Sequence, residues 1–275
     1  MSIENDEYCN FEEMRDILSL GGIRALVIGA GSGIGLGISY GVLANGGTVM
    51  AADINDKALE KLRLSVEGIE GTIYTEVCDL TSVDSVRNLY SAAIEKLGKI
   101  DAVYVVAGID PVQRIENFDY ETFDRAVELN FKGAFVALKE IAVKIGKEFN
   151  EGSVVLIASS LTQRTEIGQG VYSATKGAVI QLARAFSAEM GKYNIRVNVI
   201  APGIVETPMT ERLRKDKKSY SECAAKSPLN RWARVKDVVG PALFLATEGA
   251  SFINASVIFV DGGASFIDNR FIPEI

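Results

Sequence analysis

Two side chains that can exchange protons, Tyr172 and Lys176, stand four residues apart. The spacing of apolar residues predicts a helix over 172–192, and residues four apart on a helix share one face, so the phenol and the ammonium can meet. Ser159 precedes Tyr172 by thirteen residues, at the end of a predicted strand. A phenol with its usual pKa of about 10 is a poor base near neutrality, but a neighbouring ammonium and a cationic cofactor favour the phenolate. These residues therefore predict proton transfer by a tyrosine.

The chain contains no histidine, which narrows the possible chemistry. Ser-His-Asp and Cys-His hydrolysis and histidine-ligated zinc are excluded, so Tyr, Lys, Asp, Glu or Cys must carry any acid–base step. Cys9, Cys78 and Cys223 are far apart in the sequence and form no C-x-x-C pair. We therefore expect no disulfide framework and no metal site.

A glycine-rich stretch, residues 29–35, follows an apolar run, residues 25–28, and precedes a helical pattern. Gly29 allows a tight turn that a Cβ would penalise. Gly33 and Gly35 leave room for a pyrophosphate and for close packing of the helix on the strand. The free N–H groups at the start of that helix stabilise an anion. The stretch therefore predicts a phosphate-binding site.

An acidic residue roughly 20 positions beyond the loop is the second mark of a dinucleotide site. Asp53 ends a second apolar strand, where its carboxylate can accept hydrogen bonds from both hydroxyls of an adenosine ribose. The same negative charge repels a 2′-phosphate, and neither Ser32 nor Ile54 supplies a cation to receive one. We therefore expect the cofactor to be NAD rather than NADP.

Apolar strands alternate with amphipathic helices along most of the chain. This alternation predicts an α/β fold, a doubly wound Rossmann-type parallel sheet of about seven strands with helices on both faces. The predicted strands cover 25–28, 48–53, 72–78, 102–106, 153–159, 196–201 and 256–260. The predicted helices begin after the glycine loop and then cover 56–66, 82–97, 120–150 (as one helix or with an interruption), 172–192 and 235–246. Open parallel sheets bind ligands at the carboxyl ends of their strands, so the candidate residues should meet there.

The strand and helix series has no linker and no repeat, so we expect one domain over residues 21–275. Residues 1–20 form an extension ahead of it, with apolar residues at helical spacing, to which we assign no chemistry. The longest break in the series, residues 203–231, is polar and too long for a plain connection. Such segments are often lids, so we expect a lid over the site.

Charge and composition limit the classes of partner that the protein can have. A net charge of −7 without a long Lys/Arg run argues against nucleic acid or an anionic membrane as the main partner. The first twenty residues are acidic and lack the basic n-region of a signal peptide, and no apolar run is long enough to span a bilayer. The cysteine usage suits a reducing compartment. We expect a cytoplasmic protein that acts on a small molecule.

Taken together, these motifs resemble the short-chain dehydrogenase/reductase family from about Leu20 to Gly263. The resemblance rests on their order and spacing as much as on the residues themselves. The matching segments are Gly29–Gly35, Asp53, Cys78–Thr81, Ala107–Gly108, Leu129–Phe131, Ile157–Ser159, Tyr172–Lys176, Arg196–Asn198, Pro202–Gly203 and Asp261–Gly263.

The resemblance implies a role for each member of a catalytic tetrad. Tyr172 would be the general acid/base, and Ser159 would polarise the substrate oxygen. Lys176 would hold the nicotinamide ribose and lower the pKa of Tyr172. Asn130 would keep a water in the proton relay; a packing role is its alternative. Ser160 is an alternative to Ser159, which the family's spacing to the tyrosine favours.

The resemblance also implies contacts with the two ends of the cofactor. Asp79 would face the adenine, with a helix cap as the alternative role. Thr207 would approach the nicotinamide carboxamide, with a turn before Pro208 as the alternative. The expected cofactor contacts are Gly29, Ser32, Gly33, Ile34, Gly35, Asp53, Asp79, Leu80, Ala107, Gly108, Tyr172, Lys176, Pro202, Gly203, Val205 and Thr207.

The chain departs from the family pattern in two places. Ile28 stands where the family usually has a threonine before its first glycine, and Val105-Val106 stand where the family usually has two asparagines. These positions support the fold and the adenine side of the site. The departures therefore concern the detailed cofactor contacts rather than the reaction class.

The expected activity is hydride transfer between NAD(H) and a secondary alcohol or ketone. The substrate class stays open among polyols or sugar acids, hydroxy acids, hydroxysteroids and 3-oxoacyl thioesters. Besides Ser159, the candidate substrate contacts are Gln113, Arg114 and Arg164, in the loops 110–114 and 161–169, although ordinary exposed loop residues would explain them equally well. The family implies a homotetramer, or else a dimer.

Two other functions compete with this one. A non-catalytic NAD(H)-binding regulator or scaffold of the same fold would have no use for a complete proton relay. A methyltransferase with a glycine loop and an acidic residue would leave Tyr172 and Lys176 unexplained.

Overall fold

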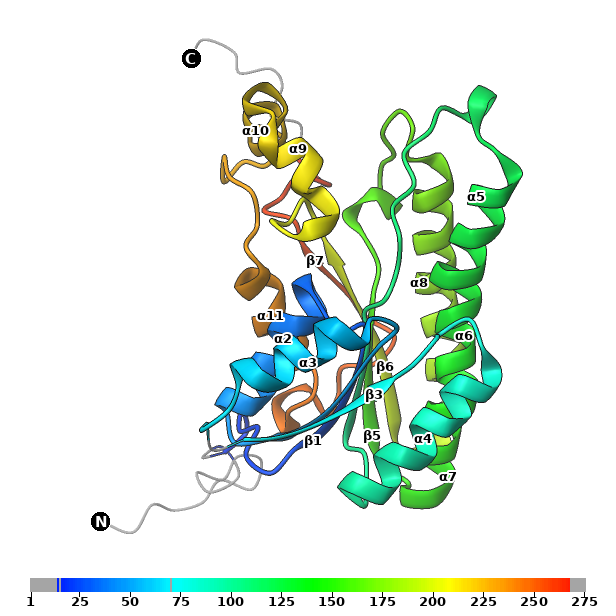
Figure 1. Ribbon diagram of the computed structural model, residues 1–275, viewed down its shortest axis with the longest axis vertical. Coiled ribbons are helices and arrows are strands. Elements are labelled where there is room, and N and C mark those ends of the chain that lie inside the picture. The colour runs from blue at the N-terminus through cyan, green and yellow to red at the C-terminus, as the bar shows by residue number, and fades with distance from the viewer. Residues whose placement is uncertain (1–13, 15, 70, 268–275) are drawn as a thin grey trace.

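The computed structural model describes residues 14, 16–69 and 71–267, which form one seven-stranded parallel sheet covered by helices on both faces (Figure 1). The strand order is β3-β2-β1-β4-β5-β6-β7. The strands are β1 (Arg24–Ile28), β2 (Thr48–Asp53), β3 (Thr72–Val77), β4 (Ala102–Val105), β5 (Gly152–Ile157), β6 (Ile195–Pro202) and β7 (Val257–Val260). This arrangement confirms the predicted fold class.

The strand order changes direction between β1 and β4. Ile28 at the end of β1 pairs with Ala52 of β2 on one side and with Val105 of β4 on the other. The chain runs outward from β1 through β2 to β3, and then returns to place β4 on the opposite side of β1. Loops leave this point in opposite directions, which opens a crevice at the carboxyl ends of the strands.

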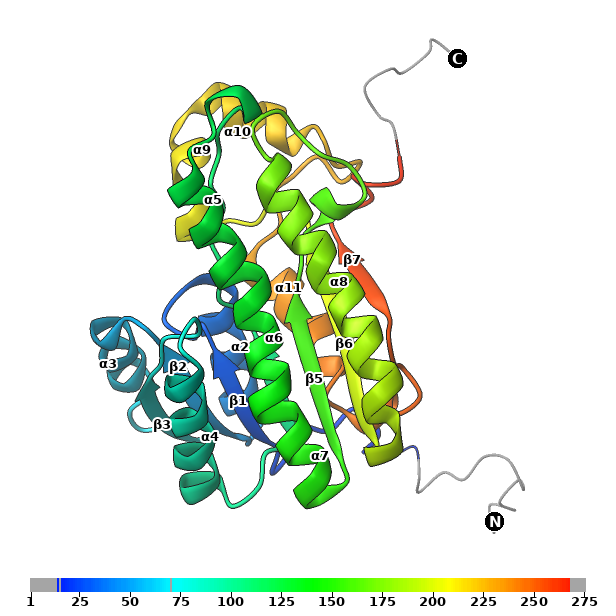
Figure 2. The same ribbon diagram turned by 90° about the vertical axis from the view of Figure 1, so that its right-hand side faces the viewer.

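The helices form two layers. In Figures 1 and 2, α2, α3 and α11 cover one face of the sheet, and α4, α5 to α7 and α8 cover the other. The helices are α2 (Gly33–Ala44), α3 (Asp56–Ser65), α4 (Val83–Leu97), α5 (Tyr120–Ala126), α6 (Gly133–Ala137), α7 (Val143–Phe149), α8 (Gly170–Met190), α9 (Glu211–Lys215), α10 (Lys217–Ala224) and α11 (Val235–Phe244).

Each layer encloses a separate apolar core, because successive residues of a strand point to opposite faces. Leu26 and Ile28 of β1 belong to the core under α4 to α8, together with Leu89 and Ile141. Their neighbours Ala25 and Val27 belong to the core under α2, α3 and α11. Both faces of the central strands are therefore buried, as their continuous apolar sequences predict.

The long helix predicted over 120–150 is continuous but not uniform. The chain passes from α5 through a π-helical segment, Val127–Lys132, into α6, and through a second one, Leu138–Ala142, into α7. A π-helical segment widens the turn locally and is frequent at functional sites. The first of these segments contains Asn130.

The segment expected to be a lid, residues 203–231, contains α9 and α10, which lie beyond the carboxyl ends of the strands (Figure 2). It is fixed by Trp232, whose side chain is buried and stacks on the Tyr220 ring with the centroids 5.1 Å apart. The indole Nε1 donates a hydrogen bond to the Tyr220 carbonyl oxygen at 2.9 Å. The segment thus has a small core of its own.

The predicted extension, residues 1–20, lies mostly outside the described residues. Its last part contacts the domain: the Gly249 N–H donates to the Ile17 carbonyl oxygen at 2.7 Å, and Leu20 is buried.

Gly35 sets how closely α2 approaches β1. A Cβ at this position would lie 2.0 Å from the carbonyl oxygen of Gly29, a backbone atom that no side-chain rotation can move. The absence of a side chain therefore lets the helix begin directly above the turn after β1. Gly191 offers a contrast, because it is exposed and helical (φ −55°, ψ −34°) with no atom within 4 Å of the same point.

We expect Gly35→Ala to destabilise the protein by at least about 2 kcal/mol, because overpacking of a rigid contact forces the backbone to shift. Gly191→Ala should change the free energy of unfolding by no more than about 1 kcal/mol, and in the stabilising direction. Urea unfolding of both variants measures the difference. Equal midpoints for the two variants would contradict the assigned role of Gly35.

Candidate active site

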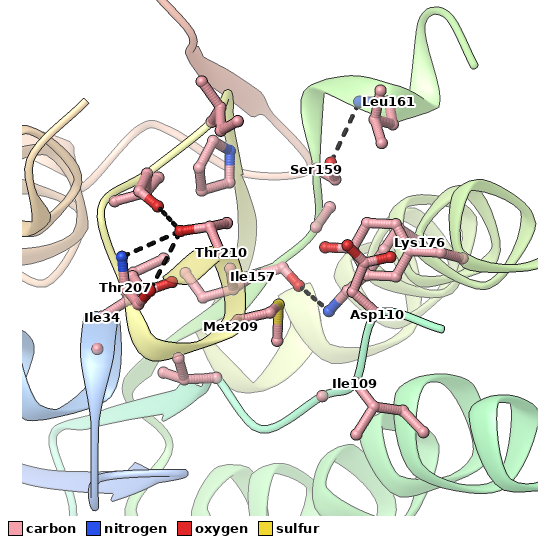
Figure 3. A pocket seen from close by; sticks show the side chains of 18 of the residues that line it. Ile34, Ile109, Asp110, Ile157, Ser159, Leu161, Lys176, Thr207, Met209 and Thr210 are labelled. Carbon is pink, nitrogen blue, oxygen red and sulfur yellow. Dashed lines mark hydrogen bonds between the residues drawn. The ribbon is translucent and has the colours of Figure 1, made fainter. Parts of the chain in front are cut away.

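A cavity of about 790 Å³ lies at the carboxyl edge of the sheet. Its walls come from the ends of β1, β2, β4, β5 and β6, from the loop over 160–169 and from the segment 203–231. Its volume is in the range of cavities that enclose organic ligands. Figure 3 shows part of it, with Ser159, Asp110 and Lys176 on one side and Ile34 and Thr207 on the other.

The glycine loop forms one end of this cavity. Gly29 has φ +91°, and a Cβ there would lie 2.6 Å from the Ala107 nitrogen. Gly33, with φ +52°, is the first residue of α2, so the N-terminus of that helix faces the cavity. Ser32, Gly33 and Ile34 line the cavity. The site thus has the open helix end that a pyrophosphate requires.

Asp53 lies beside this loop at the end of β2. One carboxylate oxygen accepts a hydrogen bond from the Gly31 N–H at 2.9 Å, and the other accepts one from the Asn55 N–H at 2.9 Å. The side chain is therefore fixed and faces the cavity, which it lines together with Ile54. Its negative charge stands where the sequence predicts the adenosine ribose.

Asp79 lines the cavity next to Leu80, but it does not cap a helix. Its Oδ1 accepts hydrogen bonds from the Thr81 N–H at 2.9 Å and from the Thr81 hydroxyl at 2.7 Å. The cap of α4 is Ser82. The carboxylate of Asp79 thus shapes a turn while it faces the cavity. Ala107 and Gly108 continue the same wall.

The chain after β6 folds back toward the glycine loop. Gly203 passes so close to Asp261 that a Cβ would lie 2.9 Å from its Cα. Thr207 packs against the loop, since a Cβ at Gly33 would lie 3.3 Å from Thr207 Cγ2. Thr207 also begins a short 3-10 helix, Pro208–Thr210, so it holds a turn and lines the cavity at once. Pro202, Gly203 and Val205 line the cavity as well.

Of the expected cofactor contacts, only Gly35 is not part of the cavity wall. Its position against Gly29 gives it the packing role described above.

Ser159 and Lys176 lie on the opposite wall (Figure 3), and Tyr172 lines the cavity with them. Ser159 follows β5, and Tyr172 and Lys176 lie in the first turns of α8, which begins at Gly170, two residues earlier than predicted. Lys176 is buried, and its Nζ donates a hydrogen bond to the Ile157 carbonyl oxygen at 2.8 Å. The Nζ lies 5.9 Å from the centre of the Tyr172 ring. Helix α8 therefore presents both side chains to the end of β5.

Burial is the main electrostatic influence on Tyr172. It raises the pKa of the Tyr172 phenol above its usual value, the negative charge of Asp110 raises it further, and a hydrogen bond with Ser159 lowers it in part. In the protein alone, removal from water therefore dominates and disfavours the phenolate. The lowering of the Tyr172 pKa by Lys176 together with a cationic cofactor stays a prediction.

Burial also acts on Lys176, in the opposite direction. It lowers the pKa of the Lys176 ammonium to about 8, and Asp110 partly opposes this change. The ammonium is thus held in the protein at a cost in stability.

Asn130 is buried and ties together three parts of the site. Its Nδ2 donates to the Ile109 carbonyl oxygen at 2.9 Å and to Thr175 Oγ1 at 3.1 Å, and its Oδ1 accepts from the Ile109 N–H at 2.8 Å. Its side chain does not line the cavity. In this structure Asn130 joins the π-helical segment, the loop after β4 and α8.

The structure separates the candidate substrate contacts. Arg164 lines the cavity. Gln113 does not: its amide donates to Asp119 Oδ2 at 3.0 Å, and its Oε1 accepts from the Asp119 N–H at 3.3 Å. Arg114 is exposed and also lies outside the cavity wall.

The cavity also includes Asp110 and Gln169, which the sequence did not single out. Gln169 Nε2 donates to Asp110 Oδ2 at 3.2 Å, and burial raises the pKa of the Asp110 carboxyl. A polar residue two positions after Gly108, beyond a strand end, was the only available signal for Asp110. Nothing in the sequence distinguishes Gln169 from its neighbours.

Two possible features are absent from the part of the chain that the structure describes. No group of three His, Cys, Asp or Glu side chains there is placed to hold a metal ion. No helix within those residues is long and apolar enough to cross a membrane. Cys78 and Cys223 are buried free thiols, and Cys9 lies outside the described residues.

The strand order, the glycine turn and the acidic residue at the end of β2 define a protein of the Rossmann-type fold class. The sequence family described as enoyl-(acyl carrier protein) reductase matches residues 29–265. The chain belongs to the short-chain dehydrogenase/reductase family.

Several relatives resemble the chain over nearly their whole length. The 3-oxoacyl-(acyl-carrier-protein) reductase of Thermotoga maritima is 32% identical, over 90% of this chain and 99% of its own. Gluconate 5-dehydrogenase of Gluconobacter oxydans is 33% identical, over 90% of this chain and 96% of its own. The crystal structure of levodione reductase superposes with a TM-score of 0.85 at 30% identity, over 89% of this chain and 98% of its own. The relatives' names describe oxidoreductases of alcohol and keto groups.

The buried ammonium of Lys176 predicts a pH-dependent contribution to stability. Its pKa is about 8 in the folded protein and about 10.5 when unfolded, so between these values the unfolded state binds more protons and stability rises with pH. The destabilising effect of this charge is almost complete at pH 7, below the folded pKa of about 8, and falls as the pH rises toward the unfolded value. Relative to Lys176→Met, the wild type should therefore gain about 2–3 kcal/mol between about pH 7 and pH 10.

Urea unfolding of cofactor-free protein at several pH values measures this difference. Lys57→Met is the matched control, since Lys57 is exposed and its ammonium stays in water in both states. A difference between wild type and Lys176→Met that stays constant with pH would show that the ammonium is not penalised by burial.

Proposed function

We propose that the protein is an NAD(H)-dependent oxidoreductase that interconverts a secondary alcohol and a ketone. The observation that carries this proposal is the meeting of Ser159, Tyr172 and Lys176 on one wall of a cavity whose other end is the glycine loop with Asp53. A proton-transferring phenol and a dinucleotide cradle in one cavity are what hydride exchange with an alcohol requires.

The residues present fit NAD. The N-terminus of α2 at Gly33 lines the cavity, and Gly29, with a positive φ, forms the tight turn that leads to it. Asp53 would accept hydrogen bonds from the ribose hydroxyls, and Asp79 and Leu80 would flank the adenine. Lys176 and Thr207 would hold the nicotinamide end. Bound NAD supplies the hydride acceptor.

Tyr172 would carry the proton. In reduction it would donate its phenolic proton to the carbonyl oxygen, while Ser159 donates a hydrogen bond to the same oxygen. A phenol is protonated at neutral pH, and burial raises the pKa of Tyr172 further, which favours this direction. In oxidation the same phenol would accept the alcohol proton, with the charge of Lys176 favouring the phenolate. Asn130 would maintain the loop and helix that position the relay.

The segment 203–231 would act as a lid. It lines the cavity with residues before, within and after α9 and α10, and its own small core packs around Trp232. A closing lid would exclude water from the transfer.

We also propose that the protein is cytoplasmic and that it forms a homotetramer or a dimer. Size-exclusion chromatography with light scattering tests the oligomeric state.

Removal of the Tyr172 hydroxyl should abolish most of the activity. We expect Tyr172→Phe to lower kcat by about 10²–10⁴-fold, the usual contribution of general acid–base catalysis. The measurement is NADH formation across polyols, hydroxy acids, hydroxysteroids and hydroxyacyl thioesters, with circular dichroism to check folding.

Tyr120→Phe is the matched control, because the Tyr120 side chain is 86% exposed. It should retain wild-type activity. Full activity in Tyr172→Phe would refute the proposed mechanism. Tight NADH binding without turnover of any substrate would indicate a regulator or scaffold instead.

The choice of NAD depends on the charge of Asp53. We expect Asp53→Ser to change the ratio of kcat/KM for NAD to that for NADP by about 10–100-fold in favour of NADP, since hydrogen bonds to a charged group contribute about 1.5–3 kcal/mol. Asp56→Asn removes an exposed charge nearby and should change the ratio less than about threefold because solvent and salt screen that charge. A wild-type preference for NADP would overturn this assignment.

A further inference from the structure

The cavity contains three sequestered polar atoms without a hydrogen-bond partner. They are Arg164 Nε, Asp110 Oδ1 and Gln169 Oε1. All three residues line the cavity that also contains Ser159 and Tyr172. The fourth such atom among the described residues, Tyr104 Oη, lies in the core of the sheet instead. A buried polar group without a partner costs about 1–3 kcal/mol, so a cluster of them in a cavity points to a ligand that completes it.

The chemistry of these atoms defines the ligand. Arg164 supplies a positively charged donor, and a guanidinium fork matches the geometry of a carboxylate. Asp110 and Gln169 are joined to each other through Gln169 Nε2 and Asp110 Oδ2, which leaves one acceptor oxygen free on each. Two adjacent acceptors suit two hydroxyl donors. The complementary ligand has a carboxylate and hydroxyl groups.

Arg164 stands apart from the other cations of the cavity wall. Lys226 is paired with Glu166 at 2.7 Å, Arg231 is paired with Asp237 at 2.6 Å, and Lys176 donates to Ile157. Arg125 is exposed on α5. Arg164 is the partly buried cation of this wall to which the structure gives no hydrogen bond and no ion pair within the described residues.

We propose that the substrate is a polyhydroxy acid, whose carboxylate is bound by Arg164 and whose hydroxyl groups are bound by Asp110 and Gln169. This inference rests on the proposed oxidoreductase function and narrows its substrate class. Arg164 and Gln169 both lie in the connection between β5 and α8, beyond Ser159, while Asp110 lies in the loop after β4. The substrate would thus be bound by residues of two loops, in the cavity that Ser159 and Tyr172 also line.

The test compares acids with neutral molecules of nearly the same shape. D-gluconate, D-galactonate and 3-hydroxybutanoate are each paired with the corresponding primary amide, and NAD reduction is measured with wild type, Arg164→Gln and Arg164→Lys. We expect wild type to prefer at least one sugar acid over its amide by about tenfold or more in kcat/KM, and Arg164→Gln to lose about 10–100-fold on that acid while its amide changes little. Arg164→Lys should retain part of the preference. The kcat/KM of wild type should be higher for the two polyhydroxy acids than for 3-hydroxybutanoate.

Arg114→Gln is the matched control, since Arg114 lies in the neighbouring loop, is exposed and does not line the cavity. It should keep the wild-type preference. A preference that survives in Arg164→Gln, or that is lost equally in Arg114→Gln, would overturn the proposal. So would a wild type that prefers no acid over its amide.

A second measurement separates this proposal from the proposed function. Thermal unfolding is followed with NADH present, a condition in which an alcohol cannot be oxidised. The sugar acids should raise the melting temperature of wild type and Arg114→Gln more than their amides do, and should not do so for Arg164→Gln. If this dependence on Arg164 holds while no alcohol is oxidised with NAD, the oxidoreductase function fails and the acid site stands. If alcohols are oxidised in a Tyr172-dependent manner and Arg164→Gln has no effect in either assay, the oxidoreductase function stands and the acid site fails.

Discussion

The structure of the candidate site depends on the burial of one ammonium group. Lys176 is placed in the first turns of α8 with its Nζ against the Ile157 carbonyl oxygen, and removal of a charge from water is costly unless polar groups replace the solvent. The neighbouring chain accommodates this group closely: a Cβ at Gly108 would lie 3.2 Å from the Nζ and 3.0 Å from Asn130 Oδ1. One buried polar cluster, Lys176 and Asn130 with the backbone groups they contact, therefore joins the ends of β4 and β5 to the π-helical segment and α8.

Much of this arrangement could be predicted from the sequence because it is dictated by local physical requirements. Gly29 needs a left-handed backbone and a close approach to Ala107, and Gly35 needs contact with a carbonyl oxygen. Both requirements exclude any residue other than glycine, so a single sequence is enough to reveal them. The parallel sheet then brings Asp53 and Ser159 to one edge, since every strand ends there. The fold class could therefore be predicted correctly from these local features.

The remainder could not be predicted because it depends on how loops fold over that edge. Gln113 and Arg164 are both polar loop residues, yet the first pairs with Asp119 outside the cavity and the second lines it. Nothing in the types of these residues distinguishes the two outcomes. The rise that burial causes in the pKa of Tyr172 likewise could not be inferred from the i, i+4 spacing to Lys176. Asn130 was recognised only through the family pattern, and the structure gives it three hydrogen bonds that position chain segments.

This difference separates the parts of the protein that determine the reaction from those that determine the substrate. The residues that would bind NAD and move a proton lie at the ends of strands or in the first turns of α2 and α8, which the sheet holds rigidly. Arg164, Asp110 and Gln169 lie on loops, where a substitution does not disturb the cores on either side of the sheet. The relatives described above have names that refer to different ketones and acids, and the levodione reductase structure among them shares the fold. In this chain the loops have left a charged donor and two acceptors unpaired in the cavity. The fold does not require these unpaired polar atoms. We therefore attribute their cost in stability to a ligand that completes their hydrogen bonds in the cavity.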